Sequence, residues 1–144
     1  MFRIYRMPQG GSITLETVPI LFLAVHRGMR TGMSGGAILG LLKLILQPYI
    51  VHPAQVVLDY PLALGLLGLA GIVRRPALLG IGIGSLARGT AHLLSGAIFF
   101  AAYAPEGMNP WAYSAMYNAS YVVPEAIIAG LIVPILVRRI KGGG

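Results

Sequence analysis

Ionisable side chains inside apolar stretches are the first candidates for chemistry in this chain of 144 residues. They are Glu16, Lys43, Asp59, Arg88, His92 and Glu125. Such a group costs about 2.5–3.5 kcal/mol to insert into hydrocarbon, so its presence there indicates a function or a fixed partner. Asp59 lies near the start of the apolar stretch LDYPLALGLLGLAG, residues 58–71. A carboxylate in that position needs a partner, and we predict that a bound ligand supplies it.

The polar candidates are predicted to meet at one end of a helical bundle. Asp59 lies one turn into its predicted helix, and His92 lies in the matching half of the next one. Glu16 is near the same end of the first helix, and Asn118 begins the last. The loops at that end add the aromatic side chains Tyr49, Trp111, Tyr113 and Tyr117. A carboxylate, hydrogen-bonding groups and aromatic rings together suit a small, flat, partly cationic organic molecule.

Several of these residues also have a structural explanation. Belts of tyrosine and tryptophan occur at membrane interfaces, which is the default explanation for Tyr49, Trp111 and Tyr117. His92 could form a hydrogen bond between two helices. Lys43 lies late in its helix and is expected to extend outward to the interface.

The partner of Arg88 is an open question at this level. Arg88 lies in the middle of a span and needs an anionic or carbonyl partner, and a fixed ion pair is favoured because arginine stays charged. Asn118, Tyr121 and Glu125 are spaced i, i+3, i+7 and share one helix face. That face could line a cavity, or Glu125 could pair with Arg88. Asp59 could also pair with Arg88, although the two are predicted at different depths.

The composition places the chain in the membrane class. Hydrophobic residues make up 56% and charged residues 10%, whereas a soluble domain carries about 25% charged residues. No cysteine is present, which excludes a disulfide framework, a thiolate metal site and a cysteine nucleophile. The net charge of +7 does not indicate nucleic-acid binding, because the cations lie at the ends of apolar runs rather than on one polar face.

Five helices are predicted from the length of the apolar stretches, because a spanning helix needs about 20 mainly apolar residues. They cover residues 13–25, 31–46, 54–73, 77–102 and 118–137. Proline and glycine mark the breaks between them. The predicted fold class is an all-α integral membrane protein, with residues 1–144 as a single membrane-embedded domain.

The basic residues predict which end of the bundle faces the cytoplasm. Three clusters fall on the same side of the predicted helices: His26, Arg27 and Arg30; Arg74 and Arg75; and Arg138, Arg139 and Lys141. The two opposite loops, residues 47–53 and 103–117, contain no Lys or Arg. By the positive-inside rule the clustered side, with the C-terminus, is cytoplasmic, and the end that carries Asp59 is outside.

The N-terminal segment fits this scheme less well. Residues 1–12 are predicted as an external loop, which leaves Arg3 and Arg6 on the outer face. No cleavable apolar region precedes residue 13. An external N-terminus before an odd number of helices predicts an earlier helix, lost by truncation or by a late start codon, and hence a six-helix parent.

Three stretches carry a resemblance to a known family: MPQGGSITLETVPILFLAVHRG, YIVHPAQVVLDYPLALGLLGLAG and HLLSGAIFFAAYAPEGMNPWAYSAMYNASY. From about Met7 to the C-terminus, the chain resembles the thiamine-specific substrate-binding subunit of bacterial energy-coupling-factor vitamin transporters. The resemblance implies a six-helix bundle in the bacterial cell membrane, with both termini cytoplasmic and thiamine bound near the outer face. It also implies partners, namely a membrane coupling (T) subunit and two ATPase subunits.

The resemblance also implies ligand-binding residues. The positions that match are Asp59, Tyr60, Tyr49, His92, Phe100, Tyr113 and Asn118. Asp59 is the acidic position and Phe100 the stacking aromatic. In an ideal helix, Phe99 lies nearly on the face of His92, while Phe100 is about 80° away. Phe99 is therefore kept as a further candidate, with Glu16, Glu125, Tyr117 and Trp111.

Two features depart from the family pattern. The family's first helix, whose small residues dock onto the membrane partner, is absent from this chain. Some members also carry a tryptophan in the external loop after that helix, whereas the corresponding stretch PQGGS, residues 8–12, has no aromatic residue.

The predicted function is a high-affinity thiamine-binding membrane subunit of an ATP-driven uptake transporter, not an enzyme. The chain has no phosphate-binding lysine loop, so ATP hydrolysis must lie on its partners. No cofactor or metal is predicted, because metal-ligand spacing is absent. The alternatives are a proton-coupled small-molecule transporter using Asp59 or Glu125, an intramembrane enzyme using Asp59 and His92 as an acid–base pair, and a scaffold subunit.

Overall fold

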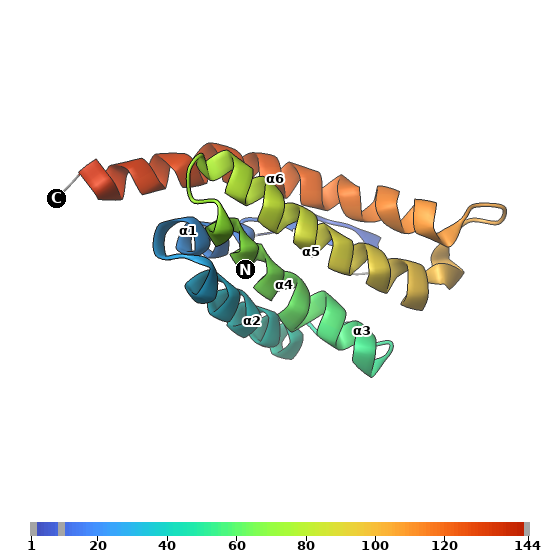
Figure 1. Cartoon of the computed structure of the whole chain (residues 1–144). Coiled ribbons are helices and arrows are strands. Elements are labelled where there is room, and N and C mark those ends of the chain that lie inside the picture. Colours follow the sequence, from blue (N-terminus) through green and yellow to red (C-terminus); the bar gives the residue numbers. More distant parts are fainter. Residues whose placement is uncertain (1–2, 9–10, 143–144) are drawn as a thin grey trace.

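The structure, a computed structural model, describes residues 3–8 and 11–142, which form an elongated helical bundle with a short two-stranded sheet (Figure 1). The strands are β1 (Arg3–Arg6) and β2 (Ser12–Thr14). The longest helices are α1 (Thr17–Arg27), α2 (Met29–Leu46), α5 (Ala77–Phe99) and α6 (Pro110–Gly142). Between α2 and α5 the chain forms one composite helix over Pro53–Ile72, and a short 3-10 turn, η4 (Ala101–Tyr103), follows α5.

Four helical segments of the described chain are long and apolar enough to cross a membrane. They are Met29–Leu46, Pro53–Ile72, Ala77–Phe99 and Pro110–Ile140. The helix α1 is apolar but shorter, with 11 residues. It packs against α2 and α6 as part of the same bundle.

The N-terminal segment is a hairpin where the sequence predicted a loop that runs into a helix. β1 and β2 pair antiparallel, with Tyr5 opposite Ile13 and Arg6 opposite Ser12. The pairing keeps the backbone of residues 12–14 extended, so α1 begins at Thr17 rather than at residue 13. Backbone groups of β2 that a helix would have satisfied internally are satisfied here by pairing with β1 and, for the N–H of Thr14, by Oε1 of Glu125.

The last helix also differs from the predicted one, because it begins at Pro110 rather than at residue 118. Proline is well suited to the first turn of a helix, where its missing N–H is not needed. The Oδ1 atom of Asn109 accepts a hydrogen bond from the N–H of Trp111 at 2.8 Å and satisfies one of the free donors there. The aromatic residues at 111, 113 and 117 therefore lie on α6 and not in a loop.

The composite helix changes geometry where it carries Asp59. It consists of α3 (Pro53–Val57), the π turn η2 (Leu58–Leu62), α4 (Ala63–Leu66) and the 3-10 turn η3 (Leu67–Ile72). Pro61 lies inside the π turn and has no N–H for the usual bond to the carbonyl four residues earlier. The wider turn accommodates this loss, and the N–H of Ala63 instead reaches the carbonyl of Leu58. Single π turns are frequent at functional sites.

Glycines on α2 bring this composite helix close. A Cβ atom added at Gly36 would lie 2.0 Å from the carbonyl oxygen of Leu64, and one added at Gly40 would lie 2.4 Å from that of Tyr60. The spacing of these small residues therefore lets the two helix backbones approach closely, as in other membrane helices. It holds α2 directly against the π turn.

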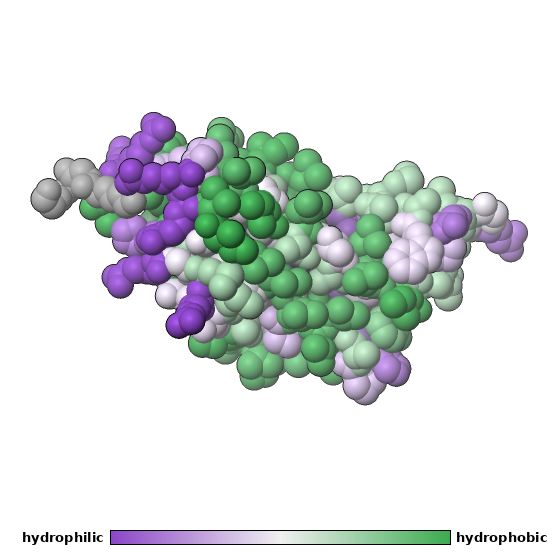
Figure 2. Space-filling view, viewed as in Figure 1, coloured by the Kyte–Doolittle hydropathy of each residue, from purple (hydrophilic) through white to green (hydrophobic). Residues whose placement is uncertain are grey.

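The apolar core and the basic residues occupy the same half of the bundle. The core cluster includes Leu21, Leu64, Leu67, Ile81 and Val133. At the adjoining end, Arg74 donates from Nε to the carbonyl of Val25 at 3.0 Å and also contacts the carbonyl of His26. Figure 2 shows hydrophilic side chains gathered at the end where the C-terminus lies and an apolar surface over the middle of the molecule. The other half of the bundle contains a cavity.

Candidate ligand-binding site

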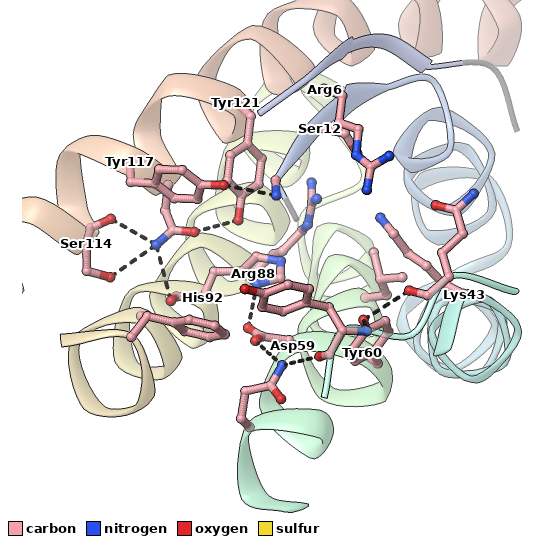
Figure 3. Close-up of a pocket in the computed structure, with 18 of the residues that line it drawn as sticks. Arg6, Ser12, Lys43, Asp59, Tyr60, Arg88, His92, Ser114, Tyr117 and Tyr121 are labelled. Atoms are coloured by element: carbon pink, nitrogen blue, oxygen red, sulfur yellow. Dashed lines mark hydrogen bonds and ion pairs between the residues drawn. The ribbon is translucent and has the colours of Figure 1, made fainter. Parts of the chain in front are cut away.

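A cavity of about 410 Å³ lies in the half of the bundle opposite the basic end. Its wall combines the N-terminal hairpin, the end of α2, the composite helix, α5 and α6 (Figure 3). Eight residues proposed from the sequence lie on this wall: Tyr49, Asp59, Tyr60, His92, Phe100, Tyr113, Tyr117 and Asn118. A volume of this size is within the range of about 300–1,000 Å³ typical of small-molecule sites.

Asp59 is bound by three side chains at this wall. Its Oδ1 atom is 3.0 Å from Nδ1 of His92, and its Oδ2 atom accepts hydrogen bonds from Nε2 of Gln55 and Oγ of Ser95, both at 2.8 Å. Asp59 does not pair with Arg88, so that alternative is excluded. All three partners are neutral when His92 is neutral, and no Lys or Arg of the described chain forms a salt bridge with Asp59.

The contact with Asp59 also orients the ring of His92. A carboxylate can only accept, so Nδ1 is the protonated nitrogen and donates to it. The other nitrogen, Nε2, is buried and has no hydrogen-bond partner within the described chain. His92 therefore lines the pocket and has a buried acceptor that no described residue uses.

Asn118 joins α5 to α6 at the same level. Its Nδ2 atom donates to the carbonyl of Ser114 at 2.8 Å and to that of His92 at 3.2 Å, and its Oδ1 atom accepts from the hydroxyl of Tyr121 at 2.5 Å. The two helices come close here at Gly96, where an added Cβ would lie 2.2 Å from Oγ of Ser114. Asn118 is thus part of the pocket wall, and the hydrogen bonds of its amide link α5 to α6.

Aromatic rings form the part of the wall near the connecting segment 47–52. The ring of Tyr49 stacks on Phe100 with 5.8 Å between centroids, and the hydroxyl of Tyr60 accepts from the N–H of Tyr49 at 2.7 Å. The hydrogen bond between the hydroxyls of Tyr49 and Tyr103, 3.2 Å apart, and partial burial raise the pKa of Tyr49. Tyr49 is therefore neutral near pH 7, and its ring presents an uncharged face.

A second aromatic row follows α6. Tyr113, Tyr117 and Tyr121 recur every four residues, with ring centroids 6.2 Å and then 6.0 Å apart. The hydroxyl of Tyr117 accepts from the N–H of Gly11 at 3.0 Å and donates to the carbonyl of Pro8. The hairpin is thereby fixed to α6, and Gly11 and Ser12 become part of the pocket wall. Of the stretch PQGGS, Gln9 and Gly10 lie outside the described residues.

Four proposed residues are not on the pocket wall. Phe99 stacks on His52 with 5.0 Å between centroids, which leaves Phe100 as the phenylalanine that lines the cavity. Trp111 is exposed at the start of α6. The two glutamates, Glu16 and Glu125, are engaged in ion pairs.

The ion pairs of the bundle account for both glutamates. Glu125 is buried, pairs with Arg88, and also accepts from the N–H and hydroxyl of Thr14 at 2.7 and 2.9 Å. Both possibilities considered for this helix face are found: Glu125 pairs with Arg88, and Asn118 and Tyr121 line the cavity. Glu16 pairs with Lys43, so Lys43 does not extend outward as expected but lies on the pocket wall.

Sequence reasoning missed Gln55, Ser95 and the hairpin residues of the wall. A signal for the first two does exist in the spacing. Gln55 precedes Asp59 by four residues and Ser95 follows His92 by three, so each shares a helix face with a residue that was proposed. No comparable signal places the hairpin.

The family model described as thiamine transporter protein (Thia_YuaJ) matches residues 1–142. The chain belongs to this family. Among Thia_YuaJ relatives, the thiamine transporter ThiT of Bacillus subtilis (strain 168) is 35% identical over 147 residues, covering 90% of this chain and 77% of the relative. ThiT of Lacticaseibacillus paracasei is 32% identical over 139 residues, covering 83% of this chain and 69% of the relative.

A solved structure supports the same assignment. ThiT from Listeria monocytogenes superposes on this structure with a TM-score of 0.81 at 26% identity, covering 89% of this chain and 79% of the other. The predicted resemblance and the all-α membrane fold class are confirmed by membership of the Thia_YuaJ family and by this match. The relatives are named as transporters, which agrees with the prediction of a transport protein rather than an enzyme. With its apolar spans, the chain is a multi-pass membrane protein.

Proposed function

We propose that this chain is the high-affinity thiamine-binding subunit of an ATP-driven vitamin uptake transporter of the energy-coupling-factor type. The observation that carries the proposal is that one carboxylate of the pocket wall forms no salt bridge with a Lys or Arg of the described chain, although Arg6, Lys43 and Arg88 also line the wall. Of the three carboxylates within the bundle, Glu16 and Glu125 are neutralised by Lys43 and Arg88. Asp59, on the pocket wall, has no such partner in the described chain. A cationic ligand supplies the missing charge.

Thiamine matches the remaining features of the pocket. It combines a positively charged thiazolium ring with a flat aminopyrimidine that carries a hydrogen-bond donor. Phe100 and Tyr49 offer ring faces on which flat and cationic groups stack. The unused acceptor of His92 suits an amino group. Membership of a family described as thiamine transporters supports this choice of ligand over other organic cations.

Each predicted ligand residue has a distinct role in this proposal. Asp59 faces the cationic ring or the amino group of the ligand. His92 accepts a hydrogen bond from the ligand. Tyr113 and Asn118 set the orientation of the ligand from α6. Phe100, Tyr60 and Tyr49 enclose its rings.

The orientation and the partners belong to the same proposal. The basic clusters support a cytoplasmic C-terminus, which places the pocket near the outer face of the bacterial cell membrane. The chain has no phosphate-binding lysine loop, so a membrane coupling subunit and two ATPase subunits drive transport.

Calorimetric titration of the purified chain tests the ligand assignment. We expect thiamine to bind with a dissociation constant below about 1 μM, whereas an isostere with an uncharged ring in place of the thiazolium binds at least about ten-fold more weakly. Equal affinity for the charged and uncharged compounds would show that Asp59 does not recognise the positive charge of the ligand. Absence of thiamine binding would refute the proposed function.

Uptake by cells tests the energy source. We expect thiamine uptake to stop when the phosphate-binding lysines of both ATPase subunits are replaced, and to persist when the proton gradient is collapsed at constant ATP. Uptake that survives the lysine replacements and is lost with the uncoupler would indicate proton coupling instead.

A further inference from the structure

Two neutral donors hold Asp59 from the side opposite His92. Nε2 of Gln55 and Oγ of Ser95 both donate to Oδ2 at 2.8 Å. Gln55 is 1% exposed and Ser95 0% exposed, so neither donor is free to turn to solvent. Each carboxylate oxygen accepts about two hydrogen bonds. Oδ2 is therefore saturated, and Oδ1, which receives one bond from His92, keeps the acceptor capacity that a ligand can use.

Gln55 also connects the carboxylate to the segment that carries Tyr49. Its Oε1 atom accepts from the N–H of Val51 at 3.1 Å, and its Nε2 atom also donates to the carbonyl of Tyr49 at 3.2 Å. One buried side chain thus fixes both Asp59 and the backbone of the wall segment whose ring stacks on Phe100. The position of the acid and the position of the ring are set together.

The neutrality of these donors matters as much as their geometry. A lysine or arginine at either position would cancel the charge of Asp59, as Arg88 cancels that of Glu125. An amide and a hydroxyl stabilise a carboxylate by hydrogen bonding and leave its net charge available. A carboxylate that binds a cationic ligand needs donors that hold it in place and a net charge that no neighbouring residue cancels.

We propose that Gln55 and Ser95 are positioning residues of the ligand site, which saturate Oδ2 of Asp59 and direct Oδ1 into the pocket. This inference rests on the proposed function, because it assigns the two residues a part in thiamine recognition. Gln55 lines the cavity and Ser95 does not, and the proposed effect of both passes through Asp59.

A double-mutant cycle tests this route of action. Ser95→Ala and Gln55→Met are each made in the full chain and again in Asp59→Asn, and thiamine is titrated up to millimolar concentration. We expect each change to lower thiamine affinity about ten-fold in the Asp59 background, the scale of a hydrogen bond to a charged group. In the Asp59→Asn background we expect less than a two-fold change, because the carboxylate through which they act is gone.

A matched control separates this effect from general damage to the helix. Thr90 is exposed on α5, and its hydroxyl bonds only within its own helix, to the carbonyl of Leu86 at 2.9 Å. Thr90→Val is expected to leave thiamine affinity unchanged. Ser95→Ala removes the hydrogen bond to Asp59 alone among those of the described residues, whereas Gln55→Met also frees backbone groups of residues 49 and 51. If Gln55→Met fails to fold, Ser95→Ala still decides the question.

A second readout does not depend on ligand binding. The chain has 3 histidines, so nitrogen NMR can assign the tautomer of the His92 ring. We expect protonated Nδ1 to dominate in the parent and in Thr90→Val, and to lose population in Ser95→Ala as the carboxylate becomes mobile. Equal affinity losses in both backgrounds, or an unchanged His92 spectrum, would overturn the positioning role. If the parent binds no thiamine, the proposed function fails, and the spectrum alone judges the positioning of Asp59.

Discussion

Two buried polar clusters lie close together in this bundle, and they differ in one respect. The cluster around Glu125 is closed in charge: its carboxylate pairs with the guanidinium of Arg88 and accepts from the backbone and hydroxyl of Thr14. Nε of Arg88, which lines the pocket, has no hydrogen-bond partner within the described chain. The cluster around Asp59 is open: its carboxylate has hydrogen-bond donors but no Lys or Arg partner in the described chain. A closed cluster joins elements of the fold, whereas an open one has charge left for a ligand.

The closed cluster explains why a charged pair is kept inside an apolar bundle. Glu125 lies on α6, Arg88 on α5 and Thr14 on β2, so the cluster ties the N-terminal hairpin to two spanning helices. The guanidinium also lies 5.8 Å from the ring centroid of Tyr121, which adds a cation–π contact. This arrangement fixes the hairpin beside the pocket.

The open cluster lies where the helices are least regular. Asp59 is on a π turn that contains a proline, and its donors come from the turn before it and from α5. A partly buried carboxylate without a counter-charge costs folding free energy. Functional sites commonly carry such a cost in exchange for binding.

The largest expected effect comes from opening the closed cluster. Arg88→Met leaves the carboxylate of Glu125 buried without a counter-charge, and breaking such a pair lowers stability by about 3–5 kcal/mol. We expect this loss in the free energy of unfolding measured by SDS titration in mixed micelles. The double variant Arg88→Met with Glu125→Gln should recover most of it, because the amide oxygen still accepts from Thr14. A larger loss of thiamine affinity than of stability would instead place Arg88 in the ligand site.

The second effect comes from removing the charge of the open cluster. Asp59→Asn is expected to lower thiamine affinity by about 1.5–3 kcal/mol, or roughly 10- to 150-fold. Its stability should stay within about 1 kcal/mol of the parent, because the amide oxygen still accepts from Gln55 and Ser95, and the amide can donate to Nδ1 of His92. Calorimetry and SDS titration of the same samples check both halves. Unchanged affinity would remove the basis of the proposed function.

The contrast between the clusters was only partly predictable from the sequence. Alternating spans and helical spacing place Asp59, His92 and Asn118 at one end of the bundle, because depth and direction follow from helix geometry. Ion-pair partners on different helices do not follow from one sequence, since several pairings satisfy the same spacing. The pair of Arg88 with Glu125 was therefore one of two possibilities, and Lys43 was placed wrongly.

Other residues of the site were harder to find from a single sequence, although spacing offered a signal for Gln55 and Ser95. Gln55 and Ser95 are neutral, so they do not stand out in an apolar stretch as charged residues do. The hairpin strands have 4 and 3 residues, too few for an alternating pattern to emerge. The start of α6 is ambiguous in the sequence, because a proline is typical both of a break between helices and, after a capping residue such as Asn109, of a helix start. The roles of the wall residues in binding stay predictions.

A third prediction concerns the partly buried ion pair of Lys43 and Glu16. Lys43 and Glu16 pair at the edge of the pocket, with 19% and 6% of their side chains exposed. Lys43→Met should cost about 1–2 kcal/mol of stability, more than an exposed pair and less than a fully buried one. Thiamine affinity should rise or stay unchanged, because a cation is removed from the wall of a site that binds a cation. A fall in affinity with stability unchanged would assign Lys43 a direct contact with the ligand.

The smallest expected effect separates the ring of Tyr49 from its hydroxyl. Among the described residues, the hydroxyl of Tyr49 forms a hydrogen bond with that of Tyr103, at an exposed position. Its removal in Tyr49→Phe should therefore change thiamine affinity by less than about 0.5 kcal/mol. The ring stacks on Phe100, and its loss in Tyr49→Ala should cost about 0.5–1.5 kcal/mol. Titration of both variants beside the parent decides between two roles. Equal losses in the two variants would mean that the hydroxyl, and hence the link to Tyr103, closes the pocket. A loss confined to Tyr49→Ala would mean that the open cluster needs a ring face beside its charge, as a flat cation requires.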